Sequence, residues 1–303
     1  RAAAAPAVTL DAAGTAGSRG RRPRDGPNLM TPIDLDAAYN NRAMVPGHPA
    51  IMAGWAGDAA AYRAARSDAA LDQPYGAGER HRYDLFPAAS PRPGAPVLLF
   101  IHGGYWQALD KASFSHMAAG ANAHGLDVAV MSYDLCPQVK LAVIVDNVIA
   151  CIRALRQRTG RRVLPFGHSA GGHLAACMAA ADWPRIGEPA DIIAAAMPVS
   201  GLFHLAPLVP TFVNKAMGMD AGEAAALSPL VWTPPRGLKV TAVVGGAESG
   251  EYHRQTRALV ECWGALGAHM KEIVVPGANH FTIIGPFSDP GSDLTAELVR
   301  LAS

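Results

Sequence analysis

The sequence has no excess of charge of one sign and no long hydrophobic run, and these two absences exclude several classes of protein. Its 26 lysines and arginines nearly balance its 25 aspartates and glutamates, so the formal net charge is only +1. That balance argues against a nucleic-acid partner, because nucleic-acid-binding surfaces are strongly basic. The longest apolar stretches, such as residues 97–101 and 192–197, are much shorter than the roughly 20 residues of a membrane-spanning helix. We therefore expect no nucleic acid and no membrane among the partners.

Cysteine is also scarce, with four residues in 303. None of them forms a C-x-x-C pair, and three fall in stretches with helical spacing. The four are Cys136, Cys151, Cys177 and Cys262. Scattered single cysteines are typical of reduced, mostly buried thiols, so we expect a cytoplasmic location.

The first thirty residues differ in composition from the rest of the chain. They are rich in alanine, glycine, proline and arginine, and they show no periodic apolar face. The paired arginines within residues 19–24 resemble a twin-arginine export signal, but no apolar segment follows them. We expect residues 1–30 to be a disordered or spuriously included leader. With 50% hydrophobic content overall, residues 31–303 can form one large domain with a full core.

From about residue 82 onward, short apolar runs alternate with amphipathic stretches. Strands are predicted at residues 97–101, 127–133, 162–166, 192–199, 239–244 and 271–275, and helices around 141–155, 170–181, 251–266 and 293–301. This alternation predicts an α/β fold with a mostly parallel sheet flanked by helices on both faces. Residues 201–235 interrupt it with five prolines. We predict that this segment is a small, partly helical, cap-like insertion, where a pocket is built.

A glycine-flanked serine follows the strand predicted at residues 162–166. Residues 167–171 read GHSAG, which matches the G-x-S-x-G turn. In that turn the glycines let a strand and a helix approach closely around the serine. The pattern alone is weak in a chain with 31 glycines, but the apolar strand before it and the alanine-rich helix after it are the required context. We therefore predict Ser169 as a nucleophile near the positive end of a helix.

Two glycines follow the strand predicted at residues 97–101, in the sequence HGGYW. Their backbone N–H groups can stabilise a developing oxyanion, so we predict an oxyanion hole formed by Gly103, Gly104 and Ala170. The plain alternative is a glycine turn before a pair of core aromatic residues. The position of this turn on a strand before the serine favours the oxyanion hole, and His102 is predicted to be structural.

The base and the acid are expected later in the chain. His280 is the only histidine beyond the last predicted strand, so it is the predicted base. The loop after residues 239–244 offers Glu248 and Glu251. We predict Glu248 as the acid, because Glu251 is better placed to charge the first turn of the next helix. No H-E-x-x-H or S-x-x-K motif is present at these positions, so no metal and no other cofactor is predicted.

Tyr105 and Trp106 directly follow the predicted oxyanion glycines. At least one of these rings is expected to border the pocket, and we predict both as substrate-binding residues. The alternative for Trp106 is that it packs under the loop. An aromatic pocket favours a flat aryl leaving group, and the bulk of Tyr105 favours a small acyl group.

The motifs HGGYW, GHSAGGHL, GGAESGEYHRQ and NHFTII together resemble the kynurenine formamidase (arylformamidase) group of α/β hydrolases. The resemblance covers most of the chain from about residue 33. Esterases of the hormone-sensitive-lipase type usually carry a third glycine where Tyr105 stands and an aspartate where His168 stands. Eukaryotic members of the formamidase group generally have an aspartate at the position of Glu248.

The resemblance implies an α/β-hydrolase fold and a metal-independent serine hydrolase that removes a formyl group from an aryl amine such as N-formylkynurenine. The implied nucleophile, base and acid agree with Ser169, His280 and Glu248. A carboxylesterase acting on short-chain or aryl esters is the alternative. A catalytically silent binding module is disfavoured, because all three residues are present. We expect a small-molecule ester or amide as the partner, and a homodimer is left open.

Overall fold

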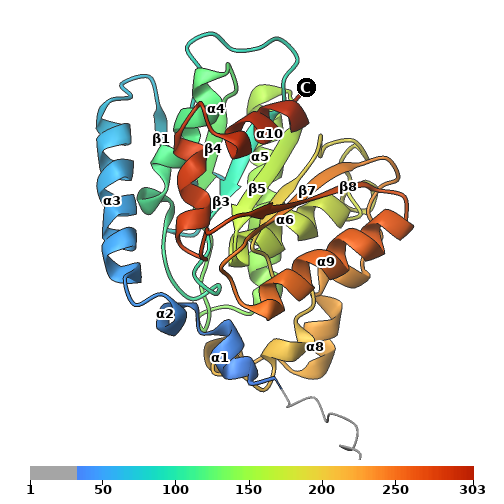
Figure 1. Ribbon diagram of the computed structural model, residues 1–303. Helices are drawn as coiled ribbons and strands as arrows, with labels where there is room; N and C mark the ends of the chain where they lie inside the picture. The colour runs from blue at the N-terminus through green and yellow to red at the C-terminus, as the bar shows by residue number, and fades with distance from the viewer. Residues whose placement is uncertain (1–32) are drawn as a thin grey trace, which may run out of the picture. The chain divides into compact units, whose positions relative to one another are not determined.

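A mostly parallel sheet of eight strands forms the centre of the computed structural model, which describes residues 33–303 (Figure 1). The strand order is β1-β2-β4-β3-β5-β6-β7-β8. The strands are β1 (Ala70–Pro74), β2 (Arg82–Phe86), β3 (Val97–Ile101), β4 (Val128–Met131), β5 (Val163–His168), β6 (Met197–Val199), β7 (Lys239–Gly245) and β8 (His269–Val275). The pairs β1–β2 and β2–β4 are antiparallel, and the other five pairs of this sheet are parallel. The leader predicted at residues 1–30 lies outside the described residues.

Helices cover both faces of the sheet, and each face has its own hydrophobic core. One core contains buried residues of α5 (Leu141–Thr159), α6 (Ala170–Ala180) and α9 (Gly250–Ala265). The other contains buried residues of α3 (His48–Ala64), α4 (Ala119–Ala123) and α10 (Asp293–Leu301). Side chains along β3 alternate between the two cores. Burial on both faces explains why this strand reads as a continuous apolar run.

The longest helix illustrates how the sequence pattern forms an element. The buried residues of α5 recur every three or four positions, at Leu141, Ile144, Val148, Ile152 and Leu155, as a helix with one apolar face requires. Gly160 then adopts φ 69° at the C-cap. That left-handed conformation, which glycine reaches without strain, ends the helix.

Several elements differ from the sequence-based expectation. The two antiparallel strands β1 and β2 were not predicted, and neither were the helices α1 (Leu35–Tyr39), α2 (Asn41–Met44) and α3. The predicted strand at residues 192–199 is paired as a ladder only over β6, because Ile193 and Ala196 meet their neighbours in isolated bridges. No helix in the described part of the chain combines the length and apolarity needed to cross a bilayer.

Residues 201–235 contain short helices and lie beside the start of the described chain. Two α-helices, α7 (Asn214–Met217) and α8 (Ala221–Ala226), are flanked by 3₁₀ turns at Ala206–Leu208 and Pro229–Val231. Outside this segment, further 3₁₀ turns occur at Lys111–Ser113, Ser115–Ala118, Pro184–Ile186 and Thr282–Ser288. The N–H of Phe212 donates to Asp36 of α1 at 2.7 Å, and Figure 1 shows α1 and α8 at the same end of the fold. This segment is therefore in contact with the first helix of the described chain.

Candidate active site

The carboxyl ends of the parallel strands bring the predicted site residues together. Ile101 of β3 pairs with Gly167 of β5, so the segments that carry Gly103 and Ser169 leave the sheet side by side. Further along the strand order, Gly245 of β7 pairs with Val275 of β8. The loops that follow β7 and β8 therefore also leave the sheet side by side. These loops carry Glu248 and His280. Ligand sites of open α/β sheets lie at this edge.

Ser169 lies on a sharp turn between β5 and α6. Its φ of 57° and ψ of −117° are rarely adopted by a residue with a side chain and carry strain of roughly 1–3 kcal/mol. The turn is tight because a Cβ on Gly171 would overlap the carbonyl oxygen of Ile101, and one on Gly167 would overlap that of Gly171. Only glycine fits these two positions. Ser169 is the N-cap residue of α6, so the positive end of that helix faces it.

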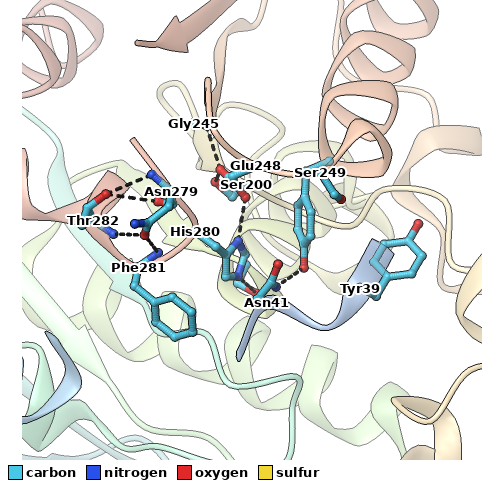
Figure 2. A network of polar contacts seen from close by, with 12 residues as sticks. Tyr39, Asn41, Ser200, Gly245, Glu248, Ser249, Asn279, His280, Phe281 and Thr282 are labelled. Atoms are coloured by element: carbon cyan, nitrogen blue, oxygen red, sulfur yellow. Dashed lines mark hydrogen bonds and ion pairs between the residues drawn. The ribbon is translucent and has the colours of Figure 1, made fainter. Parts of the chain in front are cut away.

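A chain of hydrogen bonds joins the three residues predicted as nucleophile, base and acid, and Figure 2 shows its His280–Glu248 part. His280 Nε2 lies 3.0 Å from Ser169 Oγ, and His280 Nδ1 lies 2.7 Å from Glu248 Oε2. The carboxylate can only accept at Nδ1, so Nδ1 carries the proton and Nε2 is the acceptor for the serine hydroxyl. The glutamate side chain is completely buried, and the histidine side chain is 7% exposed.

The second carboxylate oxygen of Glu248 is also held in place. Its Oε1 accepts hydrogen bonds from the N–H of Gly245 at 2.7 Å and from the hydroxyl of Ser200. Ser200 directly follows β6, and its N–H donates to Val243 in β7 at 2.7 Å. Sequence reasoning missed Ser200, because no local motif marks a serine after a three-residue strand.

The loop of His280 is stabilised by its neighbour Asn279. The side-chain oxygen of Asn279 accepts from the N–H groups of Phe281 at 2.9 Å and Thr282 at 3.0 Å, while the hydroxyl of Thr282 accepts from the N–H of Asn279 (Figure 2). The imidazole of His280 contacts two rings, those of His168 and Tyr252, each with its centroid 4.7 Å away. These contacts fix the histidine without using its two nitrogens.

The backbone donors predicted as an oxyanion hole lie around the serine turn. A Cβ on Gly103 would come within 3.0 Å of the Cβ of Ser169, which places the two residues in direct contact. Gly104 has φ 105°, a conformation that favours glycine. Within residues 33–303, the N–H groups of Gly103, Gly104 and Ala170 make no intramolecular hydrogen bond. These three donors are therefore unpaired in the described part of the chain, and Gly103 lies directly against Ser169.

A cavity of about 270 Å³ borders Ser169 and His280. Its wall is mostly apolar, and part of its polar lining comes from α2 and the residues around it. The other residues that line it are Tyr39, Asn40, Asn41, Arg42, Met52, Trp55, Gly104, Tyr105, Gln107, Ala108, Leu109, His168, Phe212 and Phe281. A cavity with aromatic walls and a few polar groups suits a small, flat molecule.

The structure brings Tyr105 to this cavity but not Trp106. The hydroxyl of Tyr105 donates to the carbonyl oxygen of Tyr39 at 2.6 Å, which fixes the ring at the cavity wall. Trp106 is completely buried, and its ring packs edge-on against His173 at 5.1 Å between centroids. The sequence-based assignment of Trp106 to substrate binding thus has no geometric support, because its indole faces the core. It lies under the loop, which was the alternative.

Two histidines near the site are held neutral by burial. Burial lowers the pKa of His102 to about 4 and that of His168 well below 6.5. The ring of His102 stacks on Tyr133 at 4.2 Å, and its Nδ1 lies 2.8 Å from the carbonyl oxygen of Gly103. His102 therefore supports the glycine loop. Among residues 33–303, no group of three or more histidines, cysteines or acidic residues is placed to hold a metal ion.

Residues 98–283 match the family model described as alpha/beta hydrolase fold. This match covers more than half of the chain, so the chain belongs to the α/β-hydrolase fold family. The fold predicted from the sequence is confirmed.

Known proteins resemble the chain over most of its length. A kynurenine formamidase of Salmo salar is 29% identical over 76% of this chain and 81% of its own. A kynurenine formamidase of Drosophila melanogaster is 27% identical over 73% of this chain and 77% of its own. These similarities confirm the resemblance to the kynurenine formamidase group.

Solved structures add a second comparison. One from Silicibacter sp. tm1040, described as that of a proposed thioesterase, has a TM-score of 0.80 at 37% identity and covers 87% of this chain and 98% of that one. An arylesterase structure has a TM-score of 0.63 at 17% identity and covers 78% of this chain and 86% of that one. The second likeness concerns the fold alone.

Proposed function

We propose that this protein is a metal-independent serine hydrolase of the arylformamidase type. It removes a formyl or similarly small acyl group from an aryl amine such as N-formylkynurenine. The observation that carries the proposal is the unbroken chain of hydrogen bonds from Ser169 through His280 to Glu248 at the wall of an aromatic cavity. The kynurenine formamidases that resemble about three quarters of the chain support formyl as the acyl group.

The first half of the reaction forms an acyl-enzyme. Ser169 Oγ attacks the carbonyl carbon, and its proton moves to His280 Nε2, while Glu248 stabilises the resulting imidazolium. The carbonyl oxygen becomes an oxyanion that accepts hydrogen bonds from the N–H groups predicted as the oxyanion hole. His280 then gives its proton to the leaving nitrogen, the carbon–nitrogen bond breaks, and the aryl amine departs.

The second half releases the acid. A water molecule gives a proton to His280 and attacks the ester carbon of the acyl-enzyme. The tetrahedral intermediate collapses, the carbon–oxygen bond to Ser169 breaks, and His280 returns the proton to the serine oxygen. The products are formate, or another small acid, and the regenerated enzyme.

A carboxylesterase is the second candidate function, and it uses the same residues. The 37% identical structure described as a proposed thioesterase favours an ester-type leaving group over an amine. Fold alone does not separate the two functions. A small-molecule ester or amide is the partner in both, and the cytoplasmic location and the homodimer remain predictions.

Turnover of N-formylkynurenine and of phenyl acetate by the same preparation tests the choice. The proposal predicts hydrolysis of both, with the higher kcat/KM for the formamide. Turnover of the ester alone would make the carboxylesterase the correct function. The resemblance to kynurenine formamidases would then reflect common ancestry and not a common activity.

A further inference from the structure

A cluster of polar side chains outside the Ser169–His280–Glu248 chain borders the same cavity. Asn41, the first residue of α2, is only 3% exposed and lines the cavity. Its Nδ2 donates to the hydroxyl of Tyr252 at 2.7 Å and lies 3.2 Å from that of Tyr105. The ring of Tyr252 packs against His280. The amide of Asn41 is thus connected through one ring to the predicted base.

The hydrogen-bond donors available in this cluster determine whether the NH₂ group or the carbonyl oxygen of the Asn41 side chain faces the tyrosines. Burial raises the pKa of Tyr105 and Tyr252, so both hydroxyls keep their protons. Tyr105 donates its proton to the carbonyl oxygen of Tyr39 at 2.6 Å. The 2.8 Å contact between the two hydroxyls therefore uses the proton of Tyr252. The oxygen of Tyr252 can then only accept from Asn41, which must present its NH₂ group to the tyrosines.

The carbonyl oxygen of the Asn41 side chain is left without a hydrogen-bond partner in the described part of the chain. Asn41 Oδ1 is buried and makes no hydrogen bond with any group among residues 33–303. A buried carbonyl oxygen without a donor is unfavourable, and such groups are rare in folded proteins. In a residue that lines a cavity, an unused acceptor indicates a ligand that brings the missing donor.

We infer that Asn41 Oδ1 accepts a hydrogen bond from an N–H group of the substrate, and that Asn41 thereby selects amides over esters. This inference rests on the proposed function, since it concerns the leaving group at the same site. An anilide carries one hydrogen on its leaving nitrogen, whereas an ester oxygen carries none. When Ser169 attacks, the nitrogen becomes pyramidal, and its lone pair turns toward His280 to receive the proton. The N–H bond then points elsewhere and needs an acceptor.

No bond is formed or broken at Asn41 in this step. The side chain accepts a hydrogen bond and keeps it while the carbon–nitrogen bond breaks. An ester would instead place oxygen lone pairs against the carbonyl oxygen of the amide, which is repulsive. A site built to bond a substrate N–H disfavours the analogue that lacks it, because the buried group is then left unpaired. Asn41 is therefore a specificity-determining residue and not a proton carrier.

The test compares formanilide with phenyl formate, which share the acyl group and the ring. Asn41→Leu removes the acceptor at nearly constant volume. We expect it to lower kcat/KM for formanilide by about tenfold or more, and that for phenyl formate by less than about threefold. Tyr252→Phe is the matched control, because it disturbs the same cluster but keeps the Asn41 acceptor, while the hydroxyl of Tyr105 still accepts from Asn41 Nδ2. It should change both substrates by the same factor.

A second measurement needs no turnover of amides, and its first part uses only the wild-type enzyme. Acetanilide and N-methylacetanilide are compared as competitive inhibitors of phenyl formate hydrolysis by the wild-type enzyme. Acetanilide should bind more tightly, and in Asn41→Leu the ratio of the two inhibition constants should fall toward one, because only acetanilide has an N–H group. A failure of the wild type to hydrolyse formanilide would overturn the formamidase proposal but not this ratio. Equal inhibition constants in the wild type, or equal losses on both substrates in Asn41→Leu, would overturn the role of Asn41.

Discussion

The hydroxyl of Ser200 donates a hydrogen bond to Glu248 Oε1, the carboxylate oxygen that His280 does not contact. The two residues lie 48 positions apart in the sequence, and the end of β6 brings them together. The N–H of Gly245 donates to the same oxygen. Both oxygens of the Glu248 carboxylate are therefore held by hydrogen bonds. A carboxylate held in this way keeps the imidazole in one orientation and one tautomer.

Replacement of Ser200 by alanine tests this support. Ser200→Ala should lower kcat by about tenfold and leave KM nearly unchanged, because it removes one hydrogen bond to a buried charge while the Gly245 donor remains. Steady-state kinetics on an aryl acetate provide the measurement. Ser200→Cys keeps a weak donor of similar size and should retain more activity than the alanine variant, and an alanine variant as active as the wild type would show that the bond has no catalytic consequence.

The two glutamates of the loop after β7 should behave differently. Glu248→Gln should lower kcat by roughly 10³-fold or more, because an amide cannot stabilise the imidazolium and favours the wrong tautomer of His280. Glu251→Gln is the matched control and should stay within about threefold of the wild type. Glu251 bonds to Tyr39 and Arg254, away from the histidine. Equal losses in the two variants would leave the acid unassigned.

Glu251 should instead contribute to stability, with a defined dependence on pH. Hydrogen bonds from Arg254 hold the pKa of its carboxyl group below the ordinary value of 4.5, against the effect of burial. A lowered pKa in the folded state stabilises the protein above about pH 4.5, and this contribution is lost as the pH falls through the folded-state pKa. Urea unfolding of Glu251→Gln should therefore show a lower free energy of unfolding at pH 7, and a difference that shrinks in acid.

Several parts of this site follow from the sequence alone. Ser169 and His280 could be predicted because the fold places them at known points of the chain order, and glycine spacing marks the serine turn. Most of the parallel strands could be predicted from their apolar runs, because a strand that is buried on both faces is apolar at every position.

Other parts could not be predicted, because they depend on contacts between distant segments. Asn41 and Tyr252 are 211 positions apart, and no motif links them. The burial of Trp106 depends on the backbone turn after Gly104, where Tyr105 and Trp106 both have positive φ. A one-dimensional pattern does not reveal such a turn in residues other than glycine.

Chelation provides a further prediction. Dialysis against EDTA should leave the hydrolysis of an aryl acetate unchanged, because the proposed mechanism activates the nucleophile with His280 and stabilises the oxyanion with backbone N–H groups. The control is the untreated enzyme assayed in the same buffer. A loss of activity that added zinc restores would show that a metal takes part.

The size of the acyl group should be limited by Tyr105. Its hydroxyl is bonded to the carbonyl oxygen of Tyr39 and to Tyr252, so the ring cannot swing out of the cavity without breaking both bonds. Across a series of aryl esters from acetate to octanoate, kcat/KM should fall steeply for acyl chains of about six carbons or more. Tyr105→Gly should relax this limit, since φ 50° at this position suits glycine. Octanoate as the best substrate of the wild type would contradict a small acyl pocket.

The most direct measurement follows N-formylkynurenine hydrolysis by the wild type and by Ser169→Ala, with a fluorophosphonate probe applied to both. The account predicts release of formate by the wild type, a loss of several orders of magnitude in the variant with the fold intact, and labelling at Ser169 only. Labelling that persists in Ser169→Ala would contradict the assignment of the nucleophile. No formate from the wild type, under conditions where phenyl acetate is hydrolysed, would contradict the formamidase activity.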